Sequence, residues 1–310
     1  MDPNVRDHLL KRLPCPAAAQ VPLASVTTFR IGGPAAILAQ PRNHQELVAL
    51  LRIVHSESLS CFYLGLGSNI LVSDEGFDGV VIRVQGELTA IQMKGDVIHA
   101  GPGARLLDLT AFAAARGLSG MEPLCGIPGS VGGGLYMNAG AYGGEIADTF
   151  LDADVLDGSG KIVTLAKDEI GFGYRSAPAF ENAIILESRY RLQTGDRQNI
   201  YGEMRRVWKL RRAKQPLEFP SAGSVFKRPP GDYAGRLIEA VGAKGMQIGG
   251  AQISPKHAGF IVNVGGATAA DVSQLIRQVR KQIYDRFGIL LEPEVKAVGF
   301  AEDPFTIENR

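Results

Sequence analysis

The chain has 310 residues, of which 45% are hydrophobic and 21% are charged, as in ordinary globular proteins. Its formal net charge of +1 gives no reason to expect a nucleic acid or an anionic membrane as partner. The three cysteines, Cys15, Cys61 and Cys125, form no closely spaced pair, which argues against a zinc site or a disulfide framework and favours a reducing compartment.

The hydropathy pattern contains no candidate membrane segment. No stretch reaches the ~20 consecutive apolar residues that a spanning helix needs, and the N-terminal "MDPNVRDHLLKRLPCP" has no continuous apolar run. The five histidines show no metal-ligand spacing. We therefore expect a soluble, cytoplasmic protein that binds no metal.

The beginning of the chain predicts a first domain over residues 1–84. Residues 1–20 show little pattern, and we expect a loose arm there. A helix is predicted over "NHQELVALLRIVHS", because Asn43 and Glu46 stand at capping-box spacing and the leucines share one face. The following "CFYLGLGSNILVSDEGFDGVVIRV" predicts strand, tight turn, strand, loop and strand.

A second domain is predicted over residues 85–204. Its "GDVIHAGPGARLLDLTAFAAARGL" predicts a strand followed by a helix that ends at Gly117. "FLDADVLDGSGKIVTL" predicts a hairpin with a Gly-Ser-Gly turn, and "NAIILESRYRL" predicts a further strand.

A third domain is predicted over residues 205–296. A cationic helix, "NIYGEMRRVWKLRRAKQP", leads into it and ends at Pro216. "DYAGRLIEAVG" predicts a short helix, "HAGFIVNVGG" a strand, and "ATAADVSQLIRQVRKQIYDRFG" a long amphipathic helix. "ILLEPEVKAVGF" predicts a closing strand, and the tail 297–310 is expected to pack on the first domain.

Two glycine clusters stand out, "LGLGSN" and "GIPGSVGGGLYMNAGAYGGEI". A glycine turn after a strand brings backbone N–H groups together, as phosphate sites require. A dinucleotide fingerprint would need glycine where Ile70 stands, so a standard Rossmann site is not indicated. Two such clusters in separate domains suggest an extended ligand laid between them.

The order of seven motifs identifies a family resemblance. "TTFRIGGPA", "LGLGSNILVSDEGFDGVVI", the second glycine cluster, "FGYRSA", "PSAGSVFKRP", "MQIGGAQISPKHAGFIVN" and "FGILLEPEV" occur in the order and spacing of one family. The sequence closely resembles the UDP-N-acetylenolpyruvoylglucosamine reductases, the MurB family of bacterial peptidoglycan synthesis, which are also called UDP-N-acetylmuramate dehydrogenases.

The resemblance implies an α+β, three-domain FAD-binding fold of the vanillyl-alcohol-oxidase (PCMH) type with a C-terminal α/β substrate domain. The domains 1–84 and 85–204 would bind FAD non-covalently, and 205–296 would bind substrate. The expected cofactor-binding residues are Tyr63, Leu64, Gly65, Gly67, Ser68, Asn69, Ile70, Gly126, Ile127, Gly129, Ser130, Gly132, Gly133 and Ile184.

The resemblance also implies the chemistry. NADPH gives a hydride to flavin N5, which passes it to the β-carbon of the enolpyruvyl ether, and protonation of the α-carbon yields UDP-N-acetylmuramate. The matching positions are Arg175 and Glu294 at the substrate carboxylate and Ser224 as proton donor. The expected substrate-binding residues are Lys214, Lys227, Arg228 and His257.

Some alternatives stay open. The interval from Arg175 to Ser224 lacks the tyrosine-bearing loop of the longer class, so the chain resembles the shorter class. The family motif often has Asn after "FK", where this sequence has Arg228. A flavin oxidase or dehydrogenase of the same fold, or a non-catalytic nucleotide-sugar-binding protein, are the competing functions. A monomer is expected, with a role in cell-wall biogenesis, cell shape and division.

Overall fold

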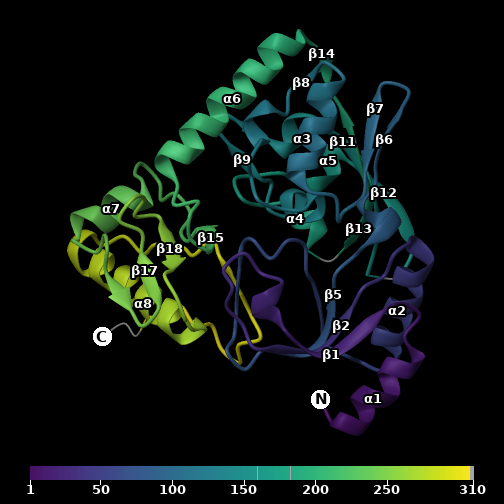
Figure 1. The fold of residues 1–310 in the computed structure, drawn as a ribbon, viewed down its shortest axis with the longest axis horizontal. Coiled ribbons are helices and arrows are strands. Elements are labelled where there is room, and N and C mark those ends of the chain that lie inside the picture. Colours follow the sequence, from purple (N-terminus) through teal and green to yellow (C-terminus); the bar gives the residue numbers. More distant parts are fainter. Residues whose placement is uncertain (159, 182, 308–310) are drawn as a thin grey trace.

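The structure, a computed structural model, describes residues 1–158, 160–181 and 183–307. Its helices are α1 (Pro3–Arg12), α2 (His44–Ser56), α3 (Leu106–Ala115), α4 (Val131–Tyr136), α5 (Lys167–Ile170), α6 (Arg197–Lys214), α7 (Ala234–Ala240) and α8 (Ala269–Phe287). Figure 1 shows them arranged around separate sheets, with α1 and α8 in different parts of the molecule.

The first sheet has the strand order β1-β2-β5-β3. Its strands are β1 (Ala17–Pro22), β2 (Pro34–Ala39), β3 (Cys61–Tyr63) and β5 (Phe77–Ile82). β2 and β3 run parallel to β5, whereas β1 is antiparallel to β2. The predicted helix α2 packs its buried residues Leu47, Leu50 and Val54 into the same core as Ile37 and Ile82.

The expectation of a loose N-terminal arm is wrong. The Asp2 side chain accepts hydrogen bonds from the first turn of α1, and Leu9 of this helix is 1% exposed. β1 then pairs with β2 and forms one edge of the first sheet. Neither element has a strong local pattern, because α1 buries few side chains and half of β1 is alanine, so tertiary packing orders the segment.

The second sheet is antiparallel throughout, in the order β12-β11-β13-β7-β6. Its strands are β6 (Ile91–Lys94), β7 (Val97–Ala100), β11 (Phe150–Leu156), β12 (Ile162–Ala166) and β13 (Ile184–Arg191). The predicted hairpin is formed by β11 and β12, although Ser159 of its Gly-Ser-Gly turn lies outside the described residues. α3 ends at Ala115, and Gly117 follows with a φ of +68°.

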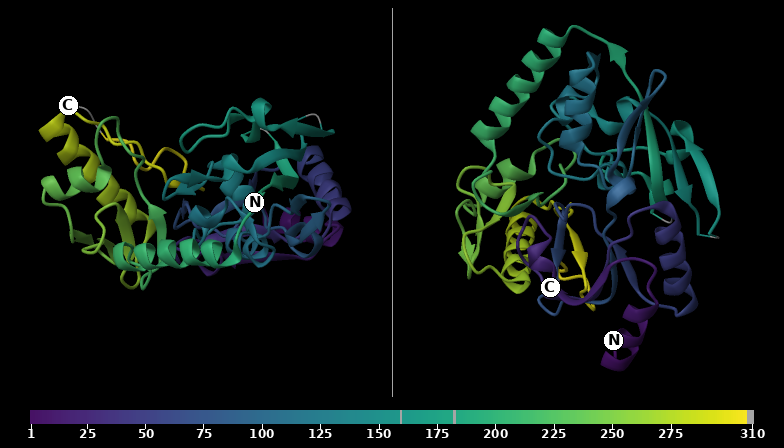
Figure 2. Two further views of the ribbon diagram at one scale, coloured as in Figure 1. Left: turned by 90° about the horizontal axis from the view of Figure 1, so that it is seen from above. Right: turned by 45° about the vertical axis from the view of Figure 1, so that its right-hand side comes forward.

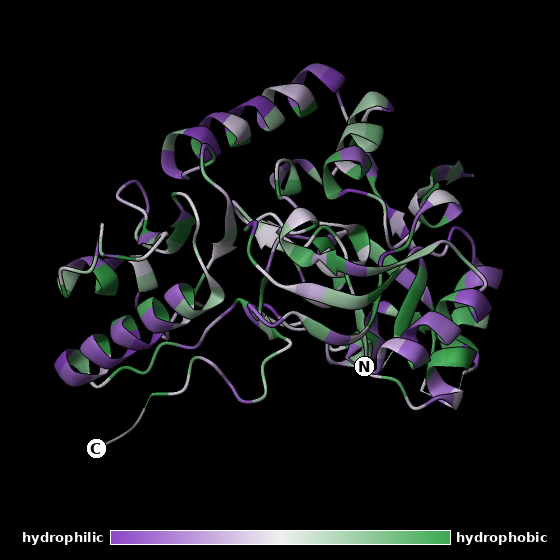
Figure 3. Ribbon diagram, turned by 60° about the horizontal axis from the view of Figure 1, so that its bottom comes forward, coloured by the Kyte–Doolittle hydropathy of each residue, from purple (hydrophilic) through white to green (hydrophobic). Residues whose placement is uncertain are grey.

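The third sheet, β15-β18-β17-β16, is also antiparallel. Its strands are β15 (Ser221–Ser224), β16 (Gln247–Ile248), β17 (Ala251–Ile253) and β18 (Phe260–Asn263). α8 covers it with the predicted apolar stripe, in which Val272, Leu275, Ile276, Val279 and Ile283 are at most 1% exposed. Figure 3 colours each residue by its hydropathy. Much of α6 and α8 is hydrophilic, and the hydrophobic residues lie toward the centre of the sheets.

Small pairings complete the fold. The remaining strands are β4 (Ile70–Val72), β8 (Leu118–Ser119), β9 (Gly140–Ala141), β10 (Gly144–Glu145), β14 (Gln193–Thr194) and β19 (Lys296–Val298). β9 pairs with β10 and β8 with β14, both antiparallel.

Distant parts of the chain are joined in two ways. The long helix α6 connects the second sheet with the third, as Figures 1 and 2 both show. The closing strand β19 pairs in parallel with β4, whereas Phe305 packs in the core beneath α8. The predicted closing strand is thus shorter than expected, and the boundaries 1–84, 85–204 and 205–296 stay a prediction.

Candidate functional site

The first glycine cluster forms a loop whose backbone donors are unused. Leu64 still donates to the Ile82 carbonyl at 2.9 Å, so the loop begins where β3 leaves the sheet. Within the described part of the chain, none of the N–H groups of residues 65–68 has a hydrogen-bond acceptor. Gly67 has a φ of +63° and its carbonyl accepts from the Thr28 N–H at 3.1 Å. Adjacent free N–H groups of this kind bind anions.

The two glycine clusters meet at Gly65 and Ser130. Ser130 precedes α4, and its Oγ accepts from the Gly133 N–H at 3.2 Å. A Cβ on Gly65 would lie 2.2 Å from that Oγ, so only glycine fits there without rearrangement. A Cβ on Gly129 would lie 3.8 Å from the Ser68 Oγ. The backbone of the first glycine cluster therefore packs against a side chain of the second, about 60 residues later in the sequence.

Other predicted cofactor residues range from buried Leu64 to Tyr63, which is 38% exposed. Leu64 is buried, and Ile70 packs beside it. Ile127 and Ile184 are partly buried against the cores of the second and first sheets respectively. Gly132 donates to the Pro102 carbonyl at 2.8 Å. Tyr63, whose phenol has its pKa raised by burial, lies at the end of the edge strand β3.

An ion pair joins two of the predicted catalytic residues. Arg175 Nε donates to Glu294 Oε1 at 2.7 Å, and Arg175 Nη2 donates to the Gly140 carbonyl at 3.1 Å. Arg175 has a φ of +55°, in the left-handed region that few non-glycine residues adopt. The strained backbone thus aims the guanidinium from the "FGYRSA" loop at a carboxylate 119 residues away.

Glu294 is held by backbone contacts as well. Its N–H donates to the Val225 carbonyl at 2.7 Å, and its carbonyl accepts from Asn69 Nδ2 at 3.1 Å. Burial raises the pKa of Glu294, and the nearby Arg175 only partly opposes that shift. The first glycine loop and the Glu294 segment are therefore physically connected.

Ser224 ends β15 next to the same segment. It pairs with Phe260, and Gly223 before it has a φ of +74° at an irregularity in the pairing with β18. Glu294 bonds to the carbonyl of Val225, the residue that follows Ser224, so the two predicted catalytic residues lie on adjoining backbone. Within the described residues the Ser224 hydroxyl has no hydrogen-bond partner, which leaves it available to a ligand.

The predicted substrate-binding residues occupy different surroundings. Lys227 is paired with Glu292 at 2.5 Å. Arg228 stacks 4.6 Å from the Tyr233 ring centre, and its N–H donates to the Tyr174 hydroxyl at 3.2 Å. Lys214 is the exposed last residue of α6.

His257 is partly buried. Its Nδ1 accepts from the Gly259 N–H at 3.1 Å, and its ring lies 5.0 Å from that of Phe260. Burial lowers the pKa of His257. The structure thus gathers Arg175, Ser224 and Glu294 closely, while no direct contact joins His257 to them.

Sequence reasoning missed Asn138, which supports the site from behind. This residue is 1% exposed, its Nδ2 donates to the Gly173 carbonyl at 3.0 Å and its Oδ1 accepts from the Ala147 N–H at 3.3 Å. It thereby ties the second glycine cluster to the loop of Arg175. Its signal in the sequence was a single polar residue among glycines, too weak to separate from turn-forming asparagine.

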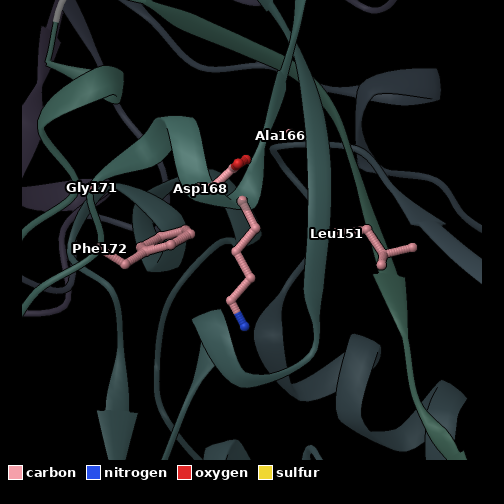
Figure 4. Close-up of a pocket in the computed structure, with 6 residues that line it drawn as sticks. Leu151, Ala166, Asp168, Gly171 and Phe172 are labelled. Atoms are coloured by element: carbon pink, nitrogen blue, oxygen red, sulfur yellow. The ribbon is translucent and has the colours of Figure 1, made fainter.

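No other feature of the described residues competes with this site. They contain no group of three metal-ligating side chains placed to hold a metal, and no helix long and apolar enough to cross a membrane. A shallow pocket lined by Leu151, Ala166, Lys167, Asp168, Gly171 and Phe172 lies beside α5 (Figure 4). It is open to solvent and shares no residue with the glycine clusters.

Comparison with known proteins gives concordant matches. Residues 35–166 match the FAD binding domain family, and residues 215–298 match the UDP-N-acetylenolpyruvoylglucosamine reductase, C-terminal domain family. A reductase of that name from Symbiobacterium thermophilum is 49% identical over 90% of this chain and 91% of its own. One from Streptococcus pyogenes is 45% identical over 90% of this chain and 94% of its own.

A solved structure matches over the same extent. The crystal structure of UDP-N-acetylenolpyruvylglucosamine reductase (MurB) from Thermus caldophilus superposes with a TM-score of 0.79 at 38% identity. The match covers 90% of this chain and 98% of that one. Sequence and structure comparisons therefore agree across both glycine clusters and the C-terminal sheet.

Proposed function

The chain belongs to the UDP-N-acetylenolpyruvoylglucosamine reductase (MurB) family, and we propose how its residues divide the work of that enzyme. It is an FAD flavoprotein oxidoreductase that reduces UDP-N-acetylenolpyruvoylglucosamine with NADPH to UDP-N-acetylmuramate, a step of peptidoglycan precursor synthesis. The predicted family, the α+β FAD-binding fold and the cofactors are confirmed.

The geometry of the two glycine clusters fits FAD. The unused N–H groups of residues 65–68 are suited to the diphosphate, and the absence of a Cβ at Gly65 leaves a cradle against Ser130. Residues Gly126 to Gly133 would then line the flavin. FAD held there would supply the two-electron chemistry that links NADPH to the β-carbon of the enolpyruvyl ether.

Arg175 and Glu294 would hold the substrate carboxylate. Electron density moves into this carboxylate when the β-carbon is reduced, so a fixed cation beside it stabilises the transition state. Burial raises the pKa of Glu294, which makes this carboxyl easier to protonate, and a protonated carboxyl would donate a hydrogen bond to the substrate carboxylate instead of repelling it. The observation that carries this proposal is the Arg175–Glu294 pair beside Ser224, assembled from three separate segments.

Ser224 would deliver the proton to the α-carbon. Its hydroxyl carries no structural hydrogen bond within the described residues, and it adjoins the backbone of Glu294. Lys214 and Arg228 would meet the diphosphate of the substrate. Lys227 is the weaker member of that set, because Glu292 already neutralises its charge.

The competing enzyme function, a flavin oxidase with covalently attached FAD, finds little support at Cys125. This thiol is fully buried, it lies 3.5 Å from the Met204 carbonyl and burial raises its pKa. A protonated, inaccessible thiol does not attack a cofactor. A non-catalytic nucleotide-sugar-binding protein would not explain why Arg175 and Glu294 are paired beside Ser224.

Anaerobic stopped-flow absorbance near the flavin band tests the proposal. NADPH should bleach the yellow protein, and only UDP-N-acetylenolpyruvoylglucosamine should restore the colour. Recolouring by air alone, with no response to the enolpyruvyl substrate, would support the oxidase instead.

Two further properties belong to this proposal. We expect a cytoplasmic enzyme, because NADPH and a UDP-linked sugar are cytoplasmic metabolites, and we expect a monomer of the shorter class that lacks the tyrosine loop. Size-exclusion chromatography with light scattering should give a mass near 33.1 kDa.

A further inference from the structure

The face of α6 that packs on the second glycine cluster carries a buried arginine. Arg211 is 4% exposed, and its Nε donates to the Cys125 carbonyl at 3.0 Å. Its guanidinium carbon lies 5.1 Å from the ring centre of Tyr142. A Cβ on Gly126 would lie 3.1 Å from Arg211 Cδ, so the side chain packs directly against the backbone of this segment.

Among the residues that the structure describes, the positive charge of Arg211 has no counter-ion. Within the described residues no carboxylate forms an ion pair with it, and its Nη2 is buried without any acceptor. Arginine remains protonated even when burial lowers its pKa, as it does here. A buried cation without a carboxylate partner destabilises the folded state, so stability alone does not explain this residue.

Other arginines with limited exposure have more hydrogen-bond acceptors than Arg211. Arg280 of α8 donates to the carbonyls of Leu291 and Phe305 and thereby ties the tail to the third sheet. Arg189 pairs with Asp152 and Asp154 on the second sheet. Arg211 therefore differs from them in having one backbone acceptor and an unused, buried Nη2.

We propose that Arg211 is a positioning residue of the cofactor site: it fixes the backbone at Cys125–Gly126, and its uncompensated charge favours the reduced form of bound FAD. The inference rests on the proposed placement of FAD against Gly126–Gly133. Hydride transfer from NADPH brings two electrons and one proton, NADP⁺ leaves, and the site gains one negative charge. A fixed cation in the wall of the site stabilises that charge, because the protein interior screens it less than water does.

The test is the midpoint potential of FAD in the holoenzyme, measured by equilibration with reference dyes. Arg211→Gln removes the charge and keeps an amide donor near Cys125. We expect the ratio of reduced to oxidised FAD at a fixed potential to fall about tenfold, which is about 30 mV for a two-electron couple. Arg212→Gln, one residue further on the exposed face of α6, is the matched control and should leave the potential unchanged.

Arg211→Lys separates charge from positioning. It keeps the cation and loses the Nε bond, so the potential should stay near that of the wild type while the FAD dissociation constant rises. An unchanged potential in folded, FAD-bound Arg211→Gln overturns the inference, and so does an equal shift in Arg212→Gln. If Arg211→Gln does not bind FAD, the test depends on Arg211→Lys. This variant keeps the charge, so a midpoint potential below that of the wild type would overturn the inference.

These outcomes do not depend on turnover of the enolpyruvyl substrate. If wild-type holoenzyme reduced by NADPH ignores that substrate, the proposed function fails. If it responds normally and the Arg211→Gln potential equals that of the wild type, only the role of Arg211 fails.

Discussion

Arg175 Nε and Glu294 Oε1 lie 2.7 Å apart, with 22% and 12% of their side chains exposed. Such a pair serves poorly as a stabilising device, because desolvation of the two charges offsets much of their attraction. Its strained Arg175 backbone and the raised pKa of Glu294 are better explained by catalysis.

Glu294→Gln should become more stable relative to the wild type as the pH rises. The folded-state pKa of Glu294 lies above its unfolded value, so its contribution is fully present below the unfolded pKa and is lost as pH rises through the folded pKa. Glutamine stays neutral and avoids that loss. Urea unfolding of both proteins at pH 4.5 and pH 8 measures the difference. If the free energy of unfolding of Glu294→Gln minus that of the wild type stays constant or falls as pH rises, the assigned shift is contradicted.

Ser224→Ala should separate the two half-reactions. Bleaching by NADPH needs no protonation of the α-carbon and should proceed at the wild-type rate. Recolouring by the enolpyruvyl substrate should slow by about 10²- to 10⁴-fold, the usual contribution of a general acid. Anaerobic stopped-flow mixing resolves both phases. Ser221→Ala, at the other end of β15, is the control, and equal slowing there would remove Ser224 from its role.

Local signals in the sequence predicted much of this fold. The Asn43 cap of α2, the apolar stripe of α8 and the β11–β12 hairpin each depend on residues close in sequence, and all three are present. For the two glycine clusters the sequence predicted a shared ligand, but it did not predict the direct contact between Gly65 and Ser130.

What the sequence did not predict depends on distant partners. The pairing of β4 with β19 joins segments more than 200 residues apart. Arg211 lies in a run of cations that is typical of a solvated helix face, and its burial results from packing against Cys125 and Tyr142. The spacing of Arg211 from Ile200 and Val207 places it on the buried face of α6, whereas Arg212 beside it is exposed, but the charge of its side chain makes that position hard to recognise among the neighbouring cations.

Gly65→Ala should weaken FAD binding and stability together. Its Cβ would overlap the Ser130 Oγ at 2.2 Å, and overpacking of this kind costs about 1–3 kcal/mol. Gly202→Ala is the matched control, because nothing lies within 4 Å of its Cβ. Alanine in that helix position should stabilise the protein by up to about 1 kcal/mol. Flavin fluorescence and urea unfolding report the two effects, and wild-type FAD affinity in Gly65→Ala would refute the close contact.

Asp74→Ala should loosen the third sheet from the first. Asp74 Oδ1 and Oδ2 accept from the N–H groups of Ala269 and Ala270 at 2.8 and 3.0 Å, so a loop after β4 caps the start of α8. Loss of such a cap costs about 1 kcal/mol, and Asp74→Asn, which keeps one acceptor, should lose less.

Because Glu294 and Ser224 lie on the α8 side of this contact, the KM for the enolpyruvyl substrate should rise in Asp74→Ala while the FAD dissociation constant stays near the wild-type value. Steady-state kinetics and fluorescence titration measure the two constants. An unchanged KM in a destabilised Asp74→Ala would mean that the cap holds α8 in place without orienting the catalytic residues.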